Sequence, residues 1–232
     1  MLATELTNDF NPTALTHYPS LSLAQKAVIT KEKLVDFLRG DPSNEDSGLG
    51  GLTDLFRNRT SPLGDVISAQ PIYVKSTVFD YQDTDYAKFR TCTEGSNSAT
   101  PPAYCDASRF PLFPQSRRGT VYVAANEGML HAFETDVNND PYFQTGGVST
   151  TDLADDAFTG NNAGNGEERW AYVPGMLLPE LQALANRPYN HRYLLDGSPN
   201  VGDICISTPC AGVDDWRTIL VGGLNKGGRG YY

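Results

Sequence analysis

The sequence lacks long hydrophobic runs and has few basic residues, and each absence excludes a class of protein. No stretch approaches the ~20 apolar residues that a membrane-spanning helix needs, so no transmembrane segment is predicted. Lys and Arg number 18 against 28 Asp and Glu, which gives a net charge of −10. Because phosphate binding requires a basic face, nucleic acid is not expected as a partner. The opening residues MLATE show neither a basic nor an apolar signal region, so no signal peptide is visible.

Residues that could carry catalysis are also scarce. The three histidines, His17, His131 and His191, belong to no recognisable triad, and no G-x-S-x-G elbow is present. His131 alternates with apolar residues in a predicted strand, a pattern typical of a hydrogen-bonded structural histidine. The glycines of 222–230 lack the G-K-[ST] end of a phosphate loop. The sequence therefore predicts no catalytic residue and no cofactor bound by this chain.

What the sequence does contain favours β structure with many turns: 22 Gly, 15 Pro and 10% aromatic residues. The central stretch is 118–134, RGTVYVAANEGMLHAFE. Residues 121–124 and 129–133 are suited to two strands, and the Asn-Glu-Gly sequence between them supplies a three-residue hairpin loop. A third strand is expected at 166–173. Apolar residues occupy both odd and even positions of each predicted strand, so both faces of the hairpin are expected to be covered.

A second copy of this pattern lies near the C-terminus. Residues 216–223 form another predicted strand that runs into glycines, and 229–232 are expected to begin a return strand after a turn. Similar lead strands at 68–74 and 197–203 precede the two hairpins. A four-stranded unit repeated with variable inserts is typical of a propeller blade. The prediction is a mainly β fold, a partial β-propeller of about one and a half blades with short helices and long loop inserts.

Four segments in order carry a family resemblance. They are RGTVYVAANEGMLHAFE, EERWAYVPGMLLPEL, YNHRYLLDGSPNVGD and WRTILVGGLNKGGRGYY. Together they resemble the β-propeller domain of the type IV pilus tip adhesins and biogenesis factors of the PilY type. The resemblance covers roughly residues 34–232 and is weak before residue 60 and in the inserts.

This resemblance implies a function without catalysis, as a pilus assembly factor and tip adhesin. The implied partners are pilin, minor pilins, and a host or abiotic surface. The implied location is the periplasm, the outer membrane or the pilus tip at the cell surface, so this chain is expected to be a piece of a longer secreted protein. Calcium is implied for the parent protein, at a loop of a later blade.

Two other functions stay open at this stage. Quinoprotein dehydrogenases use a similar strand, turn and strand, but they need a calcium-bound quinone, vicinal cysteines and stacking tryptophans. Only Trp170 and Trp216 are present here. The third possibility is a periplasmic assembly scaffold unrelated to pili.

The chain divides by pattern into a lead-in, residues 1–60, and the partial propeller, residues 61–232. The lead-in has one predicted helix at about 30–39, with Thr30 as its N-cap. Long inserts are expected at 80–117 and 135–166, and we expect these to be recognition loops. A short helix is predicted at 179–185, with one apolar face made by Leu177, Leu181, Leu184 and Ala185.

The four cysteines predict disulfides. Cys92 and Cys105 would close a loop within the first insert, and Cys205 and Cys210 enclose a predicted hairpin tip. Four cysteines allow three pairings, of which these two local bonds are favoured. A zinc site is disfavoured because neither C-x-x-C spacing nor a neighbouring His pair is present. Disulfides indicate an oxidising compartment.

One weak metal candidate lies in the second insert. Asp136, Asn138 and Asp140 stand at positions 1, 3 and 5 of a calcium loop. Pro141 occupies the position that needs glycine, and Gly147 occupies that of the bidentate glutamate. Half of the site is therefore missing, and a solvated acidic turn is the favoured interpretation.

Overall fold

The computed structural model describes residues 10–77, 79–95, 102–106, 108–110, 117–135 and 166–232. Four α-helices are described: α2 Leu23–Val28, α3 Lys31–Leu38, α4 Thr84–Glu94 and α6 Leu178–Leu181. The strands are β1 Ile72–Val74, β2 Thr120–Ala125, β3 Met129–Glu134, β4 Glu168–Tyr172, β5 Asn200–Cys205 and β6 Trp216–Val221. The 3-10 helices are η2 Pro12–Ala14, η3 Tyr18–Ser20, η4 Gly175–Leu177, η5 Gln182–Ala185, η6 Val213–Asp215 and η7 Asn225–Gly227.

The first sheet is an antiparallel meander in the order β1-β2-β3-β4. Ala125 pairs with Met129, which leaves the three-residue loop 126–128 that the sequence predicts. Gly128 has φ +94°, a left-handed conformation that favours glycine. A Cβ at this position would also come within 2.8 Å of the Leu181 side chain. The loop therefore depends on glycine for its backbone and for its close approach to the helix below it.

The far strand of this sheet, β4, is exposed along its whole length. Its pairing with β3 shifts register between Ala132 and Phe133, where a β-bulge interrupts the ladder. The inner strands are buried or half-buried at every position. The expectation of a hairpin covered on both faces therefore holds for β2 and β3, while the third strand forms an open edge.

The second sheet contains only β5 and β6, paired antiparallel from Asn200 opposite Val221 to Cys205 opposite Trp216. The expected start of a return strand at 229–232 is confirmed: Gly223 forms an antiparallel bridge with Tyr231, and Gly222 and Tyr232 exchange two backbone hydrogen bonds. The segment between them takes up a 3-10 turn, η7, instead of a tight hairpin turn. The described residues therefore form one complete four-stranded unit and part of another, and no closed propeller.

Helix α3 begins after Thr30, whose side chain accepts a hydrogen bond from the Lys33 amide. The apolar face predicted around 177–185 is buried across η4, α6 and η5, and its four residues are each at most 4% exposed. The sequence predicts a recognition loop at 80–117, whereas the structure has helix α4 within this insert. Its buried residues Tyr86, Phe89 and Cys92 recur every three positions, the spacing of one helical face.

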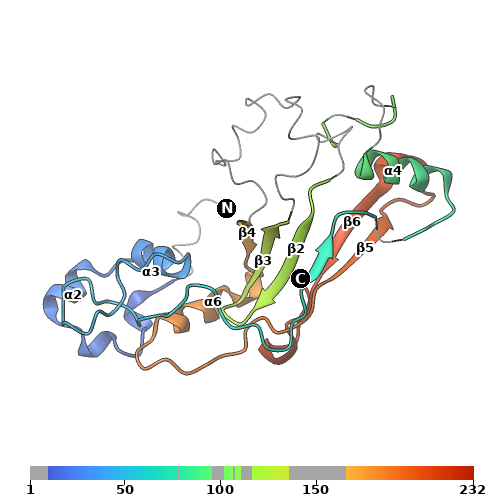
Figure 1. Ribbon diagram of the computed structural model, residues 1–232. Helices are drawn as coiled ribbons and strands as arrows, with labels where there is room; N and C mark the ends of the chain where they lie inside the picture. Colours follow the sequence, from blue (N-terminus) through green and yellow to red (C-terminus); the bar gives the residue numbers. More distant parts are fainter. Residues whose placement is uncertain (1–9, 78, 96–101, 107, 111–116, 136–165) are drawn as a thin grey trace, which may run out of the picture.

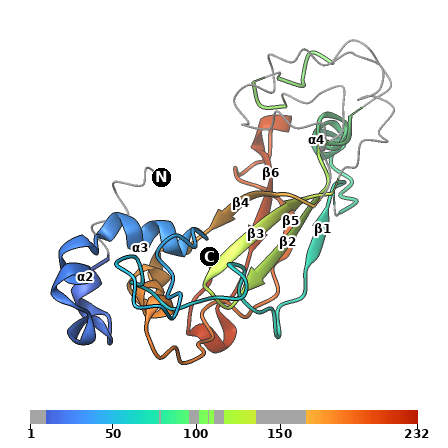
Figure 2. The same cartoon turned by 60° about the vertical axis from the view of Figure 1, so that its left-hand side comes forward.

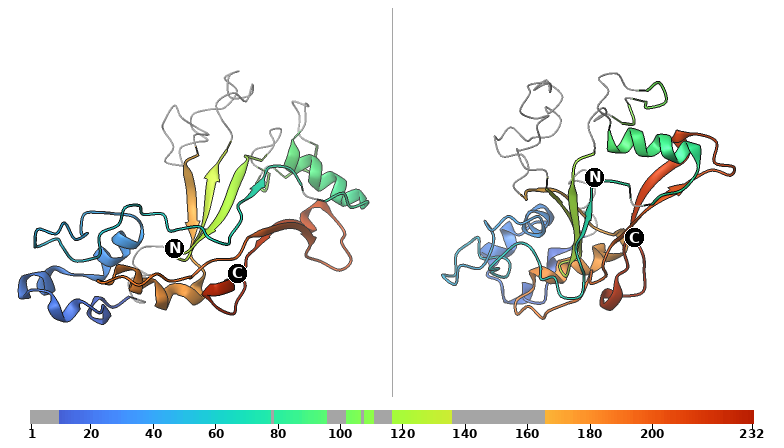
Figure 3. Two further views of the ribbon diagram at one scale, coloured as in Figure 1. Left: turned by 60° about the horizontal axis from the view of Figure 1, so that its bottom comes forward. Right: turned by 45° about the vertical axis from the view of Figure 1, so that its right-hand side comes forward.

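One buried cluster joins most of the molecule. It takes Leu34 and Phe37 from α3, Ala124 and Leu130 from the hairpin, and residues from 177–195 and 224. Residues before 60 therefore pack against the sheet through a shared core (Figure 2). A second, smaller cluster lies at the other end of the molecule, where α4 packs against the end of β5 and β6 (Figure 3).

Candidate functional site

The first insert is anchored at one end by a disulfide. Cys92, in the last turn of α4, is bonded to Cys105, thirteen residues further along the chain. Both cysteines are buried, at 2% and 6% exposure. The bond is one of the two local pairs that the sequence favours. It links the segment around Cys105 to α4.

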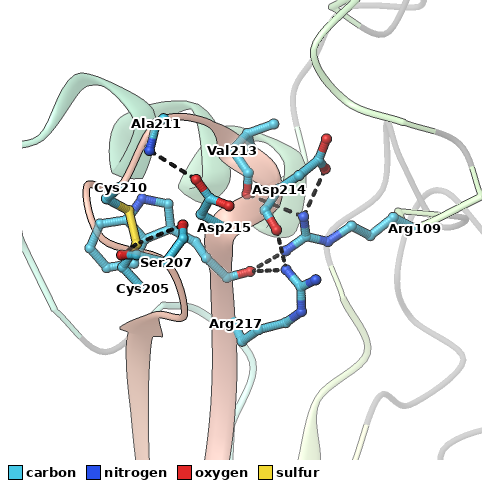
Figure 4. Close-up of a disulfide and its surroundings, with 10 residues drawn as sticks. Arg109, Cys205, Ser207, Cys210, Ala211, Val213, Asp214, Asp215 and Arg217 are labelled. Carbon is cyan, nitrogen blue, oxygen red and sulfur yellow. Dashed lines mark hydrogen bonds and ion pairs between the residues drawn. A yellow bond between two sulfur atoms is a disulfide. The ribbon is translucent and has the colours of Figure 1, made fainter.

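The second disulfide closes the connection between β5 and β6. Cys205 is the last residue of β5, and Cys210 lies five residues beyond it, on the way to η6 (Figure 4). Asp215 accepts a hydrogen bond of 2.8 Å from the Ala211 amide through Oδ2 and so orders the same turn. The pKa of Asp215 is lowered by this bond and by the Ser207 side chain.

The first insert and the β5–β6 hairpin meet around Trp216. The indole is 5% exposed, and its ring centroid lies 4.6 Å from that of Tyr86 and 5.5 Å from that of Tyr81. Cys92 and Cys105 belong to this buried cluster, and Cys205 and Cys210 pack against it. On its outer side, the Arg109 guanidinium forms an ion pair with Asp214 over 2.7 Å between Nη1 and Oδ1. We call this unit the stapled insert: α4, the Cys92–Cys105 loop, and the β5–β6 hairpin that carries Cys205–Cys210.

A buried polar network fixes α4 to the second sheet. Asp203, on β5, is 1% exposed. Its Oδ2 accepts a hydrogen bond from the Tyr86 hydroxyl over 2.8 Å, and its Oδ1 accepts one from Thr218 over 2.6 Å. Arg117 then donates to the Thr218 hydroxyl over 3.0 Å. Burial, together with the nearby Asp203 carboxylate, raises the pKa of Tyr86 to about 12.

The calcium-loop candidate stays a prediction, because Asp136, Asn138 and Asp140 are not among the described residues. Among the described residues, one group of possible ligands comes together: Cys205, Cys210 and Asp215, with ligand atoms within 4.8 Å of one another. Because the two sulfur atoms are bonded to each other, they do not provide thiolate ligands.

Two of the three histidines are buried and hydrogen-bonded within the fold. Arg187 donates from its amide to Nδ1 of His17 over 3.1 Å, so the opposite nitrogen donates to the Leu55 carbonyl over 2.7 Å. Burial is the main cause of a lowered pKa for His17. His191 is more exposed, and its Nε2 lies 3.0 Å from the Asp65 carboxylate.

His131, on β3, has the most highly charged surroundings of the three. Its Nδ1 contacts Glu168 and its Nε2 contacts Glu127, while the residue itself is 5% exposed. Burial opposes protonation, but the hydrogen bonds and charges of the two carboxylates outweigh it and raise the pKa of His131. The sequence predicts a hydrogen-bonded structural histidine here but not its partners: Glu127 is four residues away across the hairpin loop, and Glu168 is 37 residues away.

The fold and these contacts define a class: a protein of antiparallel sheets arranged as blade-like units, with disulfide-stapled insertions between the strands. The family described as "PilY1 beta-propeller domain" matches residues 64–232, and the chain belongs to this family. The resemblance predicted from the four ordered segments is thereby confirmed.

The relatives are named as pilus factors. A "Type IV pilus biogenesis factor PilY1 homolog" of Xylella fastidiosa is 29% identical over 223 residues, which is 96% of this chain and 14% of that protein. A second homolog of X. fastidiosa is 31% identical over 88% of the chain and 11% of its own length. "Type IV pilus biogenesis factor PilY1" of Pseudomonas aeruginosa strain PAK is 31% identical over 85% of the chain and 13% of its own length.

The chain therefore spans between 11% and 14% of the length of these relatives. No solved structure gives a significant match. In the part of the chain that the structure describes, no helix is both long and apolar enough to span a bilayer.

Proposed function

We propose that this chain is part of a type IV pilus assembly factor and tip adhesin that works by surface recognition and without catalysis. The sheets provide the scaffold, and the inserts contact pilin, minor pilins, or a host or abiotic surface. The names of the relatives support the pilus assignment. The two disulfides suit a location in the periplasm or at the cell surface, including the pilus tip.

The observation that carries the recognition role is how the stapled insert is held. Its helix is tied to the second sheet by the Tyr86–Asp203 hydrogen bond and by packing on Trp216. Its outer surface nevertheless exposes apolar groups: Tyr104 is 39% exposed and Ile206 is 58% exposed. A preorganised support with exposed aromatic and aliphatic groups lowers the ordering cost of binding a surface.

The experiment replaces these exposed groups in the full-length protein, expressed in a piliated bacterium. Deleting the whole insert would uncover Trp216, so point substitutions are preferred. Tyr104→Ser with Ile206→Ser is expected to reduce attachment while the amount of sheared surface pili stays unchanged. Leu23→Ser with Leu49→Ser is the matched control, because these leucines are 86% and 89% exposed, and α2, which carries Leu23, lies at the opposite end of the molecule from α4 (Figure 1). Unchanged attachment by the first pair, at normal protein level, would contradict the recognition role.

The assembly role has a separate readout. Deleting residues 64–232 from the full-length protein is expected to reduce the amount of surface pili. Normal piliation in that strain would contradict a role of this region in assembly.

A further inference from the structure

A cleft of about 690 Å³ is lined by residues 46–48 and 57–58, which follow α3, and by residues 187–189, which follow η5. It therefore lies where the lead-in meets a later segment of the chain. None of these residues belongs to the stapled insert, so the inference below does not depend on the proposed function.

Arg57, which lines this cleft, is held by the segment 184–189. Its backbone amide donates to the Ala185 carbonyl over 3.2 Å, and its Nε donates to the Leu184 carbonyl. The guanidinium carbon lies 4.0 Å from the centre of the Tyr189 ring, a cation–π contact. The guanidinium is therefore ordered before any ligand arrives, which lowers the entropy cost of binding one.

The positive charge of Arg57 is not compensated by a carboxylate. In the part of the chain that the structure describes, Arg57 forms no ion pair, and its two terminal nitrogens have no hydrogen-bond partner and are open to solvent. The side chain is half-buried, and burial lowers the pKa of Arg57. The charged neighbours that act on it, Arg59 and Glu45, are ion-paired with each other over 2.7 Å. The guanidinium has thus lost part of its hydration without gaining an anion.

The other two charged residues of the cleft balance each other. Arg187 forms an ion pair with Asp46 through Nη1 and Oδ2, and its Nη2 donates to the Asp54 carbonyl over 3.1 Å. Two arginines and one aspartate leave one surplus positive charge in the lining, although the whole chain carries −10. One surplus cation matches a single carboxylate better than a phosphate, whose charge is about −2, or a polyanion, which the rest of the surface repels.

We propose that this cleft binds the carboxylate of an acidic side chain of a partner protein through the two terminal nitrogens of Arg57. A guanidinium and a carboxylate are both planar, so they form two parallel charge-assisted hydrogen bonds. Because Nε is already used by the Leu184 carbonyl, the carboxylate approaches end-on, across both terminal nitrogens. Pro188 and Tyr189 line the cleft beside this position and contact the rest of the acidic side chain.

The test uses glutamate blocked by N-acetylation and by a C-terminal amide, so that the side-chain carboxylate is its one charge. The equally blocked glutamine is the neutral probe of the same shape. Both are added to the nitrogen-15-labelled 232-residue chain at constant ionic strength. The backbone amide signals of Gly48 and Asn58, which line the cleft, are expected to shift saturably with the glutamate probe and not with the glutamine probe.

A second hollow of the same chain is the internal comparison. Gly227 lines it together with three basic residues, Arg192, Lys226 and Arg229. Its amide signal therefore reports general attraction of a carboxylate to basic groups, and it is expected to shift little and without saturation. Equal shifts from the two probes, or saturation at Gly227 with the same affinity as at Gly48, would overturn the proposal.

Variants of Arg57 test the guanidinium itself. Arg57→Gln is expected to abolish saturable binding. Arg57→Lys should weaken it at least about threefold, because an ammonium keeps the charge but lacks the planar pair of donors. An unchanged Gly227 signal shows that each variant is folded. Binding by a folded Arg57→Gln chain as tight as that of the unsubstituted chain would overturn the proposal.

A variant with the opposite effect separates charge from misfolding. Asp46→Asn removes the carboxylate that neutralises Arg187, so it should tighten binding of the glutamate probe by up to about threefold. Asp36→Asn removes the same charge from an exposed position of α3 outside the cleft, and it should leave the affinity unchanged. Equal affinities of these two variants would contradict the charge balance on which the proposal rests.

Discussion

The hydroxyl of Tyr86 lies 2.8 Å from Oδ2 of Asp203, although the two residues are 117 positions apart in the chain. This contact connects α4, within the first insert, to β5 of the second sheet. Both residues are buried, at 0% and 1% exposure, so water does not replace the bond if it is removed. The insert therefore acts as a packed part of the fold along its helix.

Tyr86→Phe tests this contact. The substitution keeps the ring but removes the hydroxyl, which also lies 2.9 Å from the Phe79 carbonyl, and we expect it to lower the free energy of unfolding by about 1–3 kcal/mol, the cost of losing a buried hydrogen-bond donor. Urea denaturation measures the change. Tyr81→Phe is the matched control, because that residue is 41% exposed and its ring also stacks on Trp216. Equal stability of the two variants would show that the Asp203 contact contributes nothing.

The two disulfides should contribute unequally, because they close loops of different length. Cys92→Ala with Cys105→Ala is expected to cost about 3 kcal/mol, and Cys205→Ala with Cys210→Ala about 2 kcal/mol, from loop entropy. The sequence separations are 13 and 5 residues. Urea denaturation of both double variants compares the two losses, and a larger loss for the shorter loop would contradict this explanation.

Trp216 provides an optical reading of the same variants. In a Trp170→Phe background it is the remaining tryptophan, and it is 5% exposed. Quenching of its fluorescence by acrylamide should rise when the Cys92–Cys105 bond is removed. Unchanged quenching would mean that the insert stays packed on the second sheet without its disulfide.

Stability should fall as pH rises through the raised pKa of His131. In the unfolded chain the imidazole has its ordinary pKa of 6.5, and folding raises it. Folding therefore favours the protonated form, so the stabilisation is complete below about pH 6.5 and is lost above the raised pKa. Urea denaturation at about pH 6 and about pH 9 should show a smaller difference in His131→Gln than in the unsubstituted chain.

Two glutamate variants serve as the comparison for this pH effect. Glu168→Gln removes one of the two carboxylates that raise the pKa of His131, so it should reduce the pH dependence in part. Glu167→Gln, with no contact to the imidazole, should leave it as it was. A pH dependence that survives intact in His131→Gln would assign the effect to another group.

Gly64→Ala should be destabilising although the position is outside any helix or strand. A Cβ at residue 64 would lie 1.8 Å from Oε2 of Glu127 and 2.7 Å from its backbone nitrogen. Relief requires movement of the hairpin loop, at a cost of about 1–3 kcal/mol. Gly175→Ala is the control, since its Cβ would meet no atom within 4 Å. A midpoint of urea unfolding for Gly64→Ala equal to that of Gly175→Ala would contradict the close approach.

Local rules within the sequence determined the central hairpin, the capped helix after Thr30, the apolar face of 177–185 and the pairing of cysteines close in the chain. Each depends on residues within about a dozen positions, where periodicity, turn chemistry and loop closure act directly. Sequence resemblance also determined the family. Local sequence also predicts the turn at 225–228 and the start of the return strand at 229–232, where Tyr231 bridges Gly223 beyond η7.

Tertiary structure decided the rest. The docking of α4 on the second sheet depends on Asp203 and Trp216, which are more than a hundred residues from the helix, and no local pattern encodes that partner. His131 combines both: its place on a strand and its contact with Glu127 across the hairpin loop are local, whereas its second carboxylate, Glu168, is brought into contact by the pairing of β3 with β4. Periodicity determines which side of an element is buried, and packing alone determines what it is buried against.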